Sequence, residues 1–307
     1  MKRCYSILPW LAACLLMTGL LAVGIGCARE EKAVANIDTP PAVPGEKRFP
    51  LRGEIVSANP RNQTLTVMHE EIKGFMPGMT MEFKVSPGDL AIARPGRKIR
   101  AELVVRGNDF SLEKIWPDDT ATAAALAASA NALTQDTAMR GKGAYREIGE
   151  SLPDFTLLDQ EGRAVTGNRF RGKQVVLNFI FTRCPVANMC PAATLRMMAL
   201  QKAARAAGIQ DLELVSISLD PDYDTPGVLK QYADVRGIDT SNFSFLTGPD
   251  AAVRQLLAQM GIIREFDGPT IKHTLATLLI NPEGRIAYRA DGSTWEVEDF
   301  IRHLKKT

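Results

Sequence analysis

The sequence predicts two domains of different class, a small all-β barrel followed by an α/β domain. Short segments of alternating apolar and polar residues fill residues 50–117, and Asn-Pro, Pro-Gly and Gly-Asn turns separate them. From residue 146 onward, apolar runs alternate with amphipathic stretches of helical length. The first pattern is typical of short antiparallel strands that close into a barrel. The second pattern is typical of helices layered on a sheet.

Each region predicts a set of elements in order. Strands of the first region are expected at residues 53–57, 64–69, 80–85, 98–105 and 110–116. In the second region, strands are expected at 175–182, 212–219, 275–280 and 285–290, and helices at 192–207, 226–235, 251–260 and 297–305. Residues 118–145, which are rich in Ala, Thr, Ser and Asn, are expected to be a partly helical linker in the flexible regime.

Residues 1–27 have the features of an export signal. Basic residues at the start precede an almost uncharged apolar run over residues 7–25. The run ends at Cys27, which resembles the lipid-modified cysteine of bacterial lipoproteins. We therefore expect an exported protein that a lipid on Cys27 tethers to the periplasmic side of the cell membrane. A plain cleaved signal and a retained membrane anchor remain alternatives. Residues 28–49 are polar and contain several prolines, which predicts a tether.

Charge excludes one class of partner. The 307 residues include 37 Lys and Arg against 35 Asp and Glu, so neither sign dominates. No basic run with interleaved aromatic residues is present, and nucleic acid is therefore not an expected partner.

Cys184 and Cys190 are the most informative residues of the second region. They lie between an apolar run that ends near Phe181 and the helix expected from residue 192. A cysteine pair between a strand and a helix is the arrangement of thioredoxin-like proteins, and a helix N-terminus favours the thiolate. Thiolates bind Cu(I) and attack disulfides, so the pair indicates copper chemistry, thiol exchange or both. A structural disulfide is the remaining alternative, although so short a loop gains little stability from one.

Three motifs of the second region resemble the SCO/SenC family of copper-handling thioredoxin-like proteins. They are FTRCPVANMCP around the cysteines, SISLDPDYDTP at residues 216–226 and KHTLATLLINPEGRI at residues 272–286. The resemblance covers residues 148–305, and the change of sequence pattern at residue 146 gives a domain that spans residues 146–307.

This resemblance implies that Cys184, Cys190 and His273 bind copper. Two thiolates and one imidazole suit Cu(I), and thiolates also accommodate Cu(II). His273 is expected to open an apolar strand that brings it to the sheet edge near the cysteine loop. Five residues separate the cysteines, where the commonest form of the family has three, which changes how rigidly the sulfurs are held. Asp220 and Asp224 are expected to support this site or to cap the next helix, with Asp224 as the cap.

The first region has a second set of soft donors, in the stretch VMHEEIKGFMPGMTMEFKV. Met79 and Met81 alternate along the expected strand and therefore share a face. The stretch resembles the CusF-like periplasmic copper-binding proteins, which are small OB-like barrels that hold Cu(I) or Ag(I). This resemblance implies that His69, Met79 and Met81 are the ligands, and Met76 occupies the place of the family's capping tryptophan as a further ligand or a rim residue. The alternative is that the methionines only fill a small core.

Together, the resemblances predict an exported copper chaperone that binds Cu(I) in both domains. Its partner would be the cytochrome c oxidase subunit that carries CuA, or another copper-accepting protein. The alternative is a thiol–disulfide oxidoreductase that acts on an oxidase subunit or another periplasmic target, with Cys184 attacking and Cys190 resolving. The sequence leaves open whether the protein is an enzyme.

Overall fold

The computed structural model describes residues 45–267 and 270–305. The predicted signal, the lipidation site Cys27 and most of the predicted tether at 28–49 lie outside the described residues. Within those ranges, no helix is long and apolar enough to cross a membrane.

The first domain is one closed sheet of five strands. The strands are β1 (Glu46–Asn59), β2 (Thr64–His69), β3 (Met79–Lys84), β4 (Lys98–Arg106) and β5 (Asp109–Pro117). They follow the order β1-β2-β3-β5-β4 around the barrel, and β1 pairs antiparallel with both β2 and β4. A parallel contact between Lys84 and Ser111 joins β3 to β5. Helix α1 (Pro87–Ile92) connects β3 to β4.

Two features of this domain differ from the sequence prediction. Strand β1 begins at Glu46, inside the predicted tether, because its first residues pair with the end of β4 and Glu46 forms ion pairs with Arg48 and Arg106. Helix α1 was not predicted, because six residues are too few to show a helical period. The barrel core is apolar and inward-facing, and the OB-like character of the domain stays a prediction.

The second domain is built on a five-stranded sheet in the order β10-β9-β8-β13-β14. The strands are β8 (Gln174–Ile180), β9 (Leu212–Ser218), β10 (Phe243–Leu246), β13 (Ala276–Ile280) and β14 (Ile286–Asp291). Strands β8, β9 and β10 run parallel, whereas β13 and β14 are antiparallel to their neighbours. Two further pairs stand apart from this sheet, β6 (Thr156–Leu158) with β7 (Ala164–Thr166), and β11 (Arg264–Asp267) with β12 (Thr270–His273).

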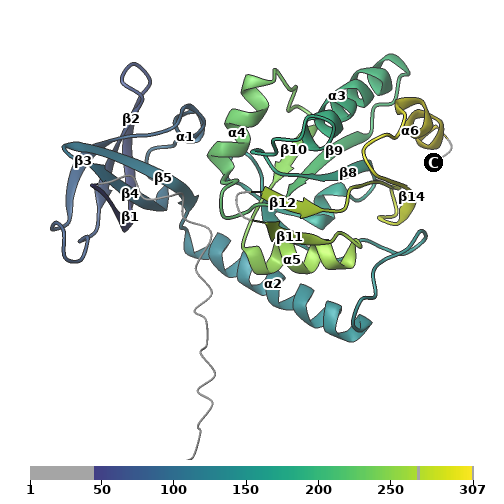
Figure 1. Ribbon diagram of the computed structural model, residues 1–307, viewed down its shortest axis with the longest axis horizontal. Helices are drawn as coiled ribbons and strands as arrows, with labels where there is room; N and C mark the ends of the chain where they lie inside the picture. The colour runs from purple at the N-terminus through teal and green to yellow at the C-terminus, as the bar shows by residue number, and fades with distance from the viewer. Residues whose placement is uncertain (1–44, 268–269, 306–307) are drawn as a thin grey trace, which may run out of the picture. The chain divides into compact units, whose positions relative to one another are not determined.

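Helices cover both faces of this sheet. They are α3 (Cys190–Ala206), α4 (Pro226–Val235), α5 (Asp250–Gln259) and α6 (Val297–Leu304), and a short 3-10 turn (Gly167–Phe170) precedes β8. Figure 1 shows α3, α4 and α6 on one side of the sheet and α5 on the other. The central strands β8 and β9 are buried almost throughout, as parallel strands covered on both faces should be. The predicted order, a β-rich domain followed by an α/β domain, is confirmed.

Residues 120–140 form helix α2 (Thr120–Arg140), which packs against α5 and β6. The carboxylate of Asp119 accepts a hydrogen bond from Thr122 N at its start. Leu126, Ala130 and Leu133 are buried on one face of the helix. The predicted helical character is confirmed for these residues, whereas the expectation of a flexible linker is wrong. Their alanine content favours a helix, but only three buried apolar residues in 21 give too weak a helical pattern in the sequence to predict the packing.

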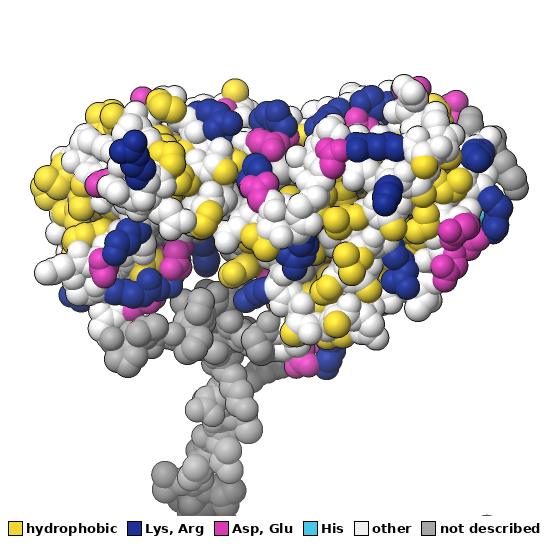
Figure 2. Space-filling model, turned by 90° about the horizontal axis from the view of Figure 1, so that it is seen from above, with side chains coloured by type: hydrophobic (Ala, Val, Ile, Leu, Met, Phe, Trp, Pro, Cys, Tyr) yellow, Lys and Arg dark blue, Asp and Glu magenta, His cyan; other side chains and the backbone are white. Residues whose placement is uncertain are grey.

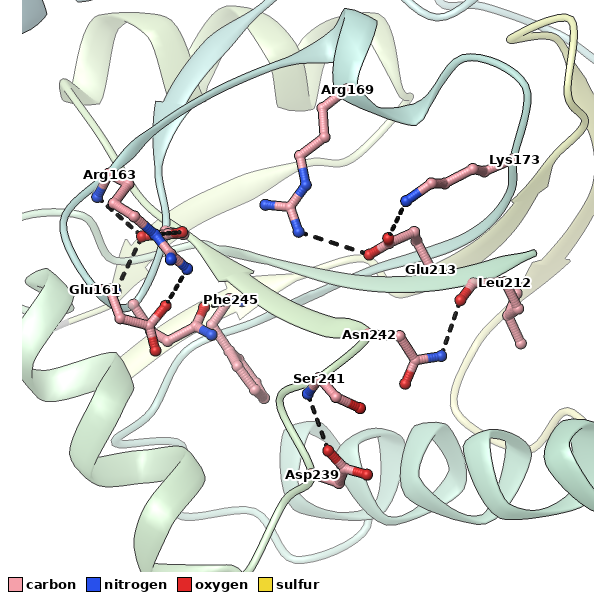
Figure 3. Close-up of polar contacts among 12 residues, drawn as sticks. Glu161, Arg163, Arg169, Lys173, Leu212, Glu213, Asp239, Ser241, Asn242 and Phe245 are labelled. Carbon is pink, nitrogen blue, oxygen red and sulfur yellow. Dashed lines mark hydrogen bonds and ion pairs between the residues drawn. The ribbon is translucent and has the colours of Figure 1, made fainter. Parts of the chain in front are cut away.

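Glu213 shows how the sheet avoids an unpaired buried charge. It lies buried near the start of β9, and Figure 3 shows Lys173 and Arg169 both pointing toward its carboxylate. The Lys173 Nζ lies 2.5 Å from one carboxylate oxygen, and the Arg169 Nη2 lies 3.8 Å from the other. Two cations offset the loss of hydration that burial imposes on this group.

Charges of both signs are mixed on the surface. Figure 2 shows Lys and Arg side chains interleaved with Asp and Glu over the face in view. This agrees with the near-even totals of the sequence and gives no broad basic surface on that face.

The packing of α2 predicts a specific stability effect. Leu133 is 1% exposed, so Leu133→Ala should lower the free energy of unfolding of the second domain by roughly 2–5 kcal/mol. Leu195 on α3 is 64% exposed, and Leu195→Ala should change the free energy of unfolding by no more than about 0.5 kcal/mol. Urea unfolding measures both. Equal, small effects of the two substitutions would mean that α2 does not pack as described.

Candidate copper sites

The two cysteines lie at the carboxyl end of β8, where the sheet gives way to α3. Cys184 is half-buried in the connecting loop, and Cys190 is the fully buried first residue of α3. Both are free thiols, and their side chains interact. The sequence prediction that they flank a strand-to-helix loop is confirmed by this placement.

His273 reaches the cysteines from a separate hairpin. It is the last residue of β12, and β13 begins only at Ala276, so the expectation that His273 opens the apolar strand is wrong. The pairing of the two strands extends one residue beyond His273, because Thr274 N donates to Ile263 O (3.0 Å) and Ile263 N donates to Thr274 Oγ1 (2.9 Å). The chain therefore forms the two-stranded β11–β12 hairpin before it enters the five-stranded sheet at β13.

The ring of His273 presents a lone pair to Cys190. Its Nε2 lies 3.6 Å from the Cys190 Sγ, and its Nδ1 lies 3.1 Å from Thr274 O. Because a carbonyl only accepts, Nδ1 carries the proton and Nε2 faces the sulfur unprotonated. Burial lowers the pKa of His273, and the hydrogen bond to Thr274 only partly opposes this. The imidazole is thus held in the neutral form that binds metals.

Cys190 is held as a thiol rather than a thiolate. Burial raises its pKa, and the nearby Cys184 and Asp224 raise it further. The expectation that the start of the helix lowers the thiol pKa is therefore wrong for Cys190, because loss of hydration outweighs the helix dipole here.

Asp224 supports the base of the cysteine loop. Its carboxylate accepts hydrogen bonds from Thr182 N (3.2 Å), from the Thr182 hydroxyl and from Ser218 Oγ (2.6 Å). Burial raises the pKa of Asp224 to about 7. The cap of α4 is Thr225, whose side chain accepts from Val228 N, so the prediction that Asp224 caps this helix is wrong. The alternative role in support of the site fits these contacts.

The structure gathers the three predicted ligands at one edge of the sheet without enclosing a metal position. Cys190 contacts His273, and Cys184 approaches Cys190. Over residues 45–267 and 270–305, no three His, Cys, Asp or Glu side chains converge closely enough to hold a metal ion. The donors nevertheless suit Cu(I) in kind, since two sulfurs and a neutral imidazole are soft or borderline ligands.

The barrel brings His69 and Met79 directly opposite each other. They pair between β2 and β3, and Val67 pairs with Met81 two residues along, so the three predicted ligands share one face. His69 is 3% exposed, whereas Met79 is 48% exposed and Met81 packs partly against the barrel core. The predicted ligands therefore differ in exposure, from the buried imidazole of His69 to the exposed thioether of Met79.

His69 repeats the arrangement of His273. Its Nδ1 lies 2.7 Å from Glu70 O, which places the proton on Nδ1, and its buried Nε2 has no hydrogen-bond partner within the protein. A buried polar atom without a partner is costly, and a bound metal ion would satisfy it. A Cβ on Gly53 would lie 2.6 Å from Met68 O, so the backbone beside His69 requires glycine there.

Met76 lies in an anchored loop between β2 and β3. Ile72 N donates to Met76 O (2.9 Å), and the Phe75 ring stacks on Phe49 with centroids 4.4 Å apart. Met76 packs partly against the barrel core, as Met81 does. Its role as a ligand stays a prediction.

Comparisons with known proteins match each domain separately. Residues 144–307 match the SCO1/SenC family, which is more than half of the chain, and residues 48–117 match the copper binding periplasmic protein CusF. The chain belongs to the SCO1/SenC family. It adds a CusF-like domain at the N-terminal side, and both families bind copper. Residues 118–143, which contain α2, lie outside both matches.

Individual relatives are similar over about half of the chain. The SCO1 protein homolog of Bacillus subtilis (strain 168) is 31% identical over 156 residues, which cover 49% of this chain and 79% of the relative. The mitochondrial protein SCO2 homolog of Homo sapiens is 28% identical over 168 residues, or 52% of this chain and 61% of that protein. A SCO1/SenC family lipoprotein of Bacillus anthracis str. Ames has a crystal structure with a TM-score of 0.49 and 29% identity, and covers 53% of this chain and 98% of its own.

The raised pKa of Cys190 predicts a pH dependence. Copper binding must displace the thiol proton, so the Cu(I) affinity of the C-terminal site should rise with pH, by about tenfold per pH unit for each proton displaced. Because the pKa of His273 is lowered, the imidazole should add no dependence above neutral pH. Chelator competition between about pH 7 and pH 9 measures this. The Cys184→Ser/Cys190→Ser variant, which retains the barrel donors, is the control, and a flat profile in the unaltered protein would contradict the buried thiol.

Proposed function

We propose that this protein is an exported copper chaperone that holds one Cu(I) in each domain and supplies copper for assembly of the CuA centre of cytochrome c oxidase. One observation carries the proposal. In each domain a histidine donates Nδ1–H to the carbonyl of the next residue and keeps its Nε2 unprotonated. The Nε2 of His273 faces Cys190 Sγ, and the buried Nε2 of His69 has no partner within the protein, on a strand residue that pairs with Met79. Metal-binding histidines are held in this way.

In the C-terminal domain, Cys184, Cys190 and His273 would hold the cargo. Cys190 forms its buried side, whereas His273 and Cys184 are both half-buried. An acceptor protein could therefore exchange ligands at Cys184 or His273 first, while Cys190 still holds the ion. Stepwise exchange of soft ligands suits transfer of Cu(I) between proteins.

In the barrel, His69, Met79 and Met81 would hold a second ion, with Met76 as a further thioether. The sulfur of Met79 belongs to the most exposed of the three ligands. Thioethers carry no proton at any ordinary pH, so binding here would not depend on thiol chemistry. This difference separates the two sites experimentally.

The proposed location is the periplasmic side of the cell membrane. The apolar N-terminal run and Cys27 support export and lipid attachment, and the matched CusF family is periplasmic. The proposed partner is the oxidase subunit that carries CuA or another copper-accepting protein.

A second function, thiol–disulfide exchange, is favoured by the contrast between the cysteines. A half-buried Cys184 beside a fully buried Cys190 is the arrangement of an attacking thiol and a resolving thiol. Its target would be the cysteines of an oxidase subunit or another periplasmic protein.

Copper counting tests the primary proposal. The reduced exported part, residues 28–307, should bind two Cu(I), and the Cys184→Ser/Cys190→Ser variant should bind one, because the soft donors form two separate sets. A stoichiometry of one that persists after removal of residues 28–117 would exclude the copper role of the barrel.

Mild oxidation provides the matched control on unaltered protein. Diamide should convert Cys184 and Cys190 to a disulfide and leave one Cu(I), since the barrel donors contain no thiol, and dithiothreitol should restore the second. If the free thiols disappear while both ions remain bound, the cysteines are not ligands.

His273→Ala separates the two functions. The substitution should weaken Cu(I) binding at the C-terminal site by about 10-fold or more and leave disulfide exchange largely intact, because an imidazole is a metal ligand but is not needed for thiolate attack. Chelator competition and insulin reduction measure the two activities. Lost reductase activity with unchanged copper affinity would favour the oxidoreductase instead.

A further inference from the structure

The hairpin that carries His273 is not hydrogen-bonded into the main sheet. Strands β11 and β12 pair only with each other among the described strands, whereas the cysteine loop continues directly from β8. The two parts of the copper site therefore belong to separately ordered segments. The chain enters β13 three residues after His273, and β13 pairs with β8, but no ladder holds the hairpin itself, so further contacts must fix its orientation.

Arg264 connects the hairpin to the body of the domain. It is paired directly across from His273 in the β11–β12 register. Its side chain is only 8% exposed, and its guanidinium donates from Nη1 to Leu219 O (2.9 Å) and from Nη2 to Asp250 Oδ1 (2.6 Å). One side chain thus joins the hairpin to the end of β9 and to the start of α5.

Leu219 is also fixed to the segment that precedes the cysteines. Leu219 N donates to Ile180 O (2.7 Å), the last residue of β8. The next residue, Asp220, binds Arg183 Nε at 2.6 Å, and Arg183 precedes Cys184. Arg264 is therefore bonded to the same short stretch that holds the start of the cysteine loop.

Apolar packing does not replace this connection. Ile271 on β12 is buried in the domain core, which keeps the hairpin against the domain. Burial of apolar surface has no preferred direction, however, whereas a planar guanidinium with two acceptors fixes both distance and orientation. The 3.6 Å contact between His273 Nε2 and Cys190 Sγ needs the second kind of restraint.

We infer that Arg264 is a positioning residue, which holds the histidine side of the C-terminal copper site against its cysteine side through Leu219 O and Asp250. The inference rests on the proposed role of His273 as a copper ligand. Arg264 is not itself a proposed donor; it acts through the hairpin that carries His273.

The test compares substitutions of two arginines that share one carboxylate. Arg264→Gln removes the bonds to Leu219 O and Asp250. Arg254→Gln is the matched control, since Arg254 also faces Asp250 (3.6 Å) but is 63% exposed and lies on α5 outside the hairpin. The readout is the electron paramagnetic resonance spectrum of the full chain loaded with Cu(II). The nitrogen hyperfine coupling that disappears in His273→Ala is the signal due to His273.

Arg264→Gln should lose most of this His273-dependent signal and lower the Cu(I) affinity of the C-terminal site by about 10-fold or more, with the fold retained by circular dichroism. In the metal-free protein, the Nε2 resonance of His273 should shift, because the ring leaves Cys190. Arg254→Gln should change neither quantity. An unchanged signal, affinity and resonance in folded Arg264→Gln would overturn the inference, whatever its melting temperature.

If Arg264→Gln does not fold, Arg264→Lys carries the test. A lysine keeps the charge opposite Asp250 but cannot form the two-armed bond, so the affinity should still fall by about threefold or more. Unaltered affinity and signal in this variant would overturn the inference. The failure of the proposed function is distinguishable, because then His273→Ala itself would leave the copper spectrum and affinity unchanged.

Discussion

The contact between His273 Nε2 and Cys190 Sγ is the constraint on which the C-terminal site depends. It joins a hairpin with its own hydrogen bonds to the start of a helix, and no strand pairing connects the two. The separation is instead set by packing and by directed polar bonds, chiefly those of Arg264 to Leu219 O and Asp250. A site built from separate segments can open on one side, which would suit the proposed release of copper.

Burial shapes the chemistry of both sites more than charge does. It raises the pKa values of Cys190 and Asp224 and lowers that of His273, so each of these groups favours its uncharged form more than it would in water. In the barrel, burial leaves His69 Nε2 without a partner. Each site therefore carries an unfavourable feature that a bound soft cation would relieve, and copper binding should stabilise both domains.

Helix α2, which lies between the two family matches, packs on the C-terminal domain. The residues between the two family matches are not a free tether over their length, because Leu133 and the backbone of α2 are bound to α5. The side chain of Gln259 donates to Leu133 O (3.3 Å) and to Thr137 Oγ1 (3.0 Å). The helix is therefore part of the C-terminal domain's own packing.

The sequence by itself determined the class of each domain and the order of most strands and helices, and it indicated the proposed soft donors. Strand alternation and the apolar runs of β8 and β9 depend on local burial, which leaves a period in the sequence. Met79 and Met81 on one face follow from the same two-residue period.

Only the tertiary structure decided how these donors are held. The separate β11–β12 hairpin, the partners of Arg264 and the role of Asp224 depend on residues far apart in the chain. The thiol pKa of Cys190 depends on how completely its neighbours exclude water. Local sequence carries no record of such long-range contacts, because any chain segment of suitable shape and polarity would serve as the partner. For that reason the sequence could propose the ligands, which stay a prediction, but could not give their positions and protonation states.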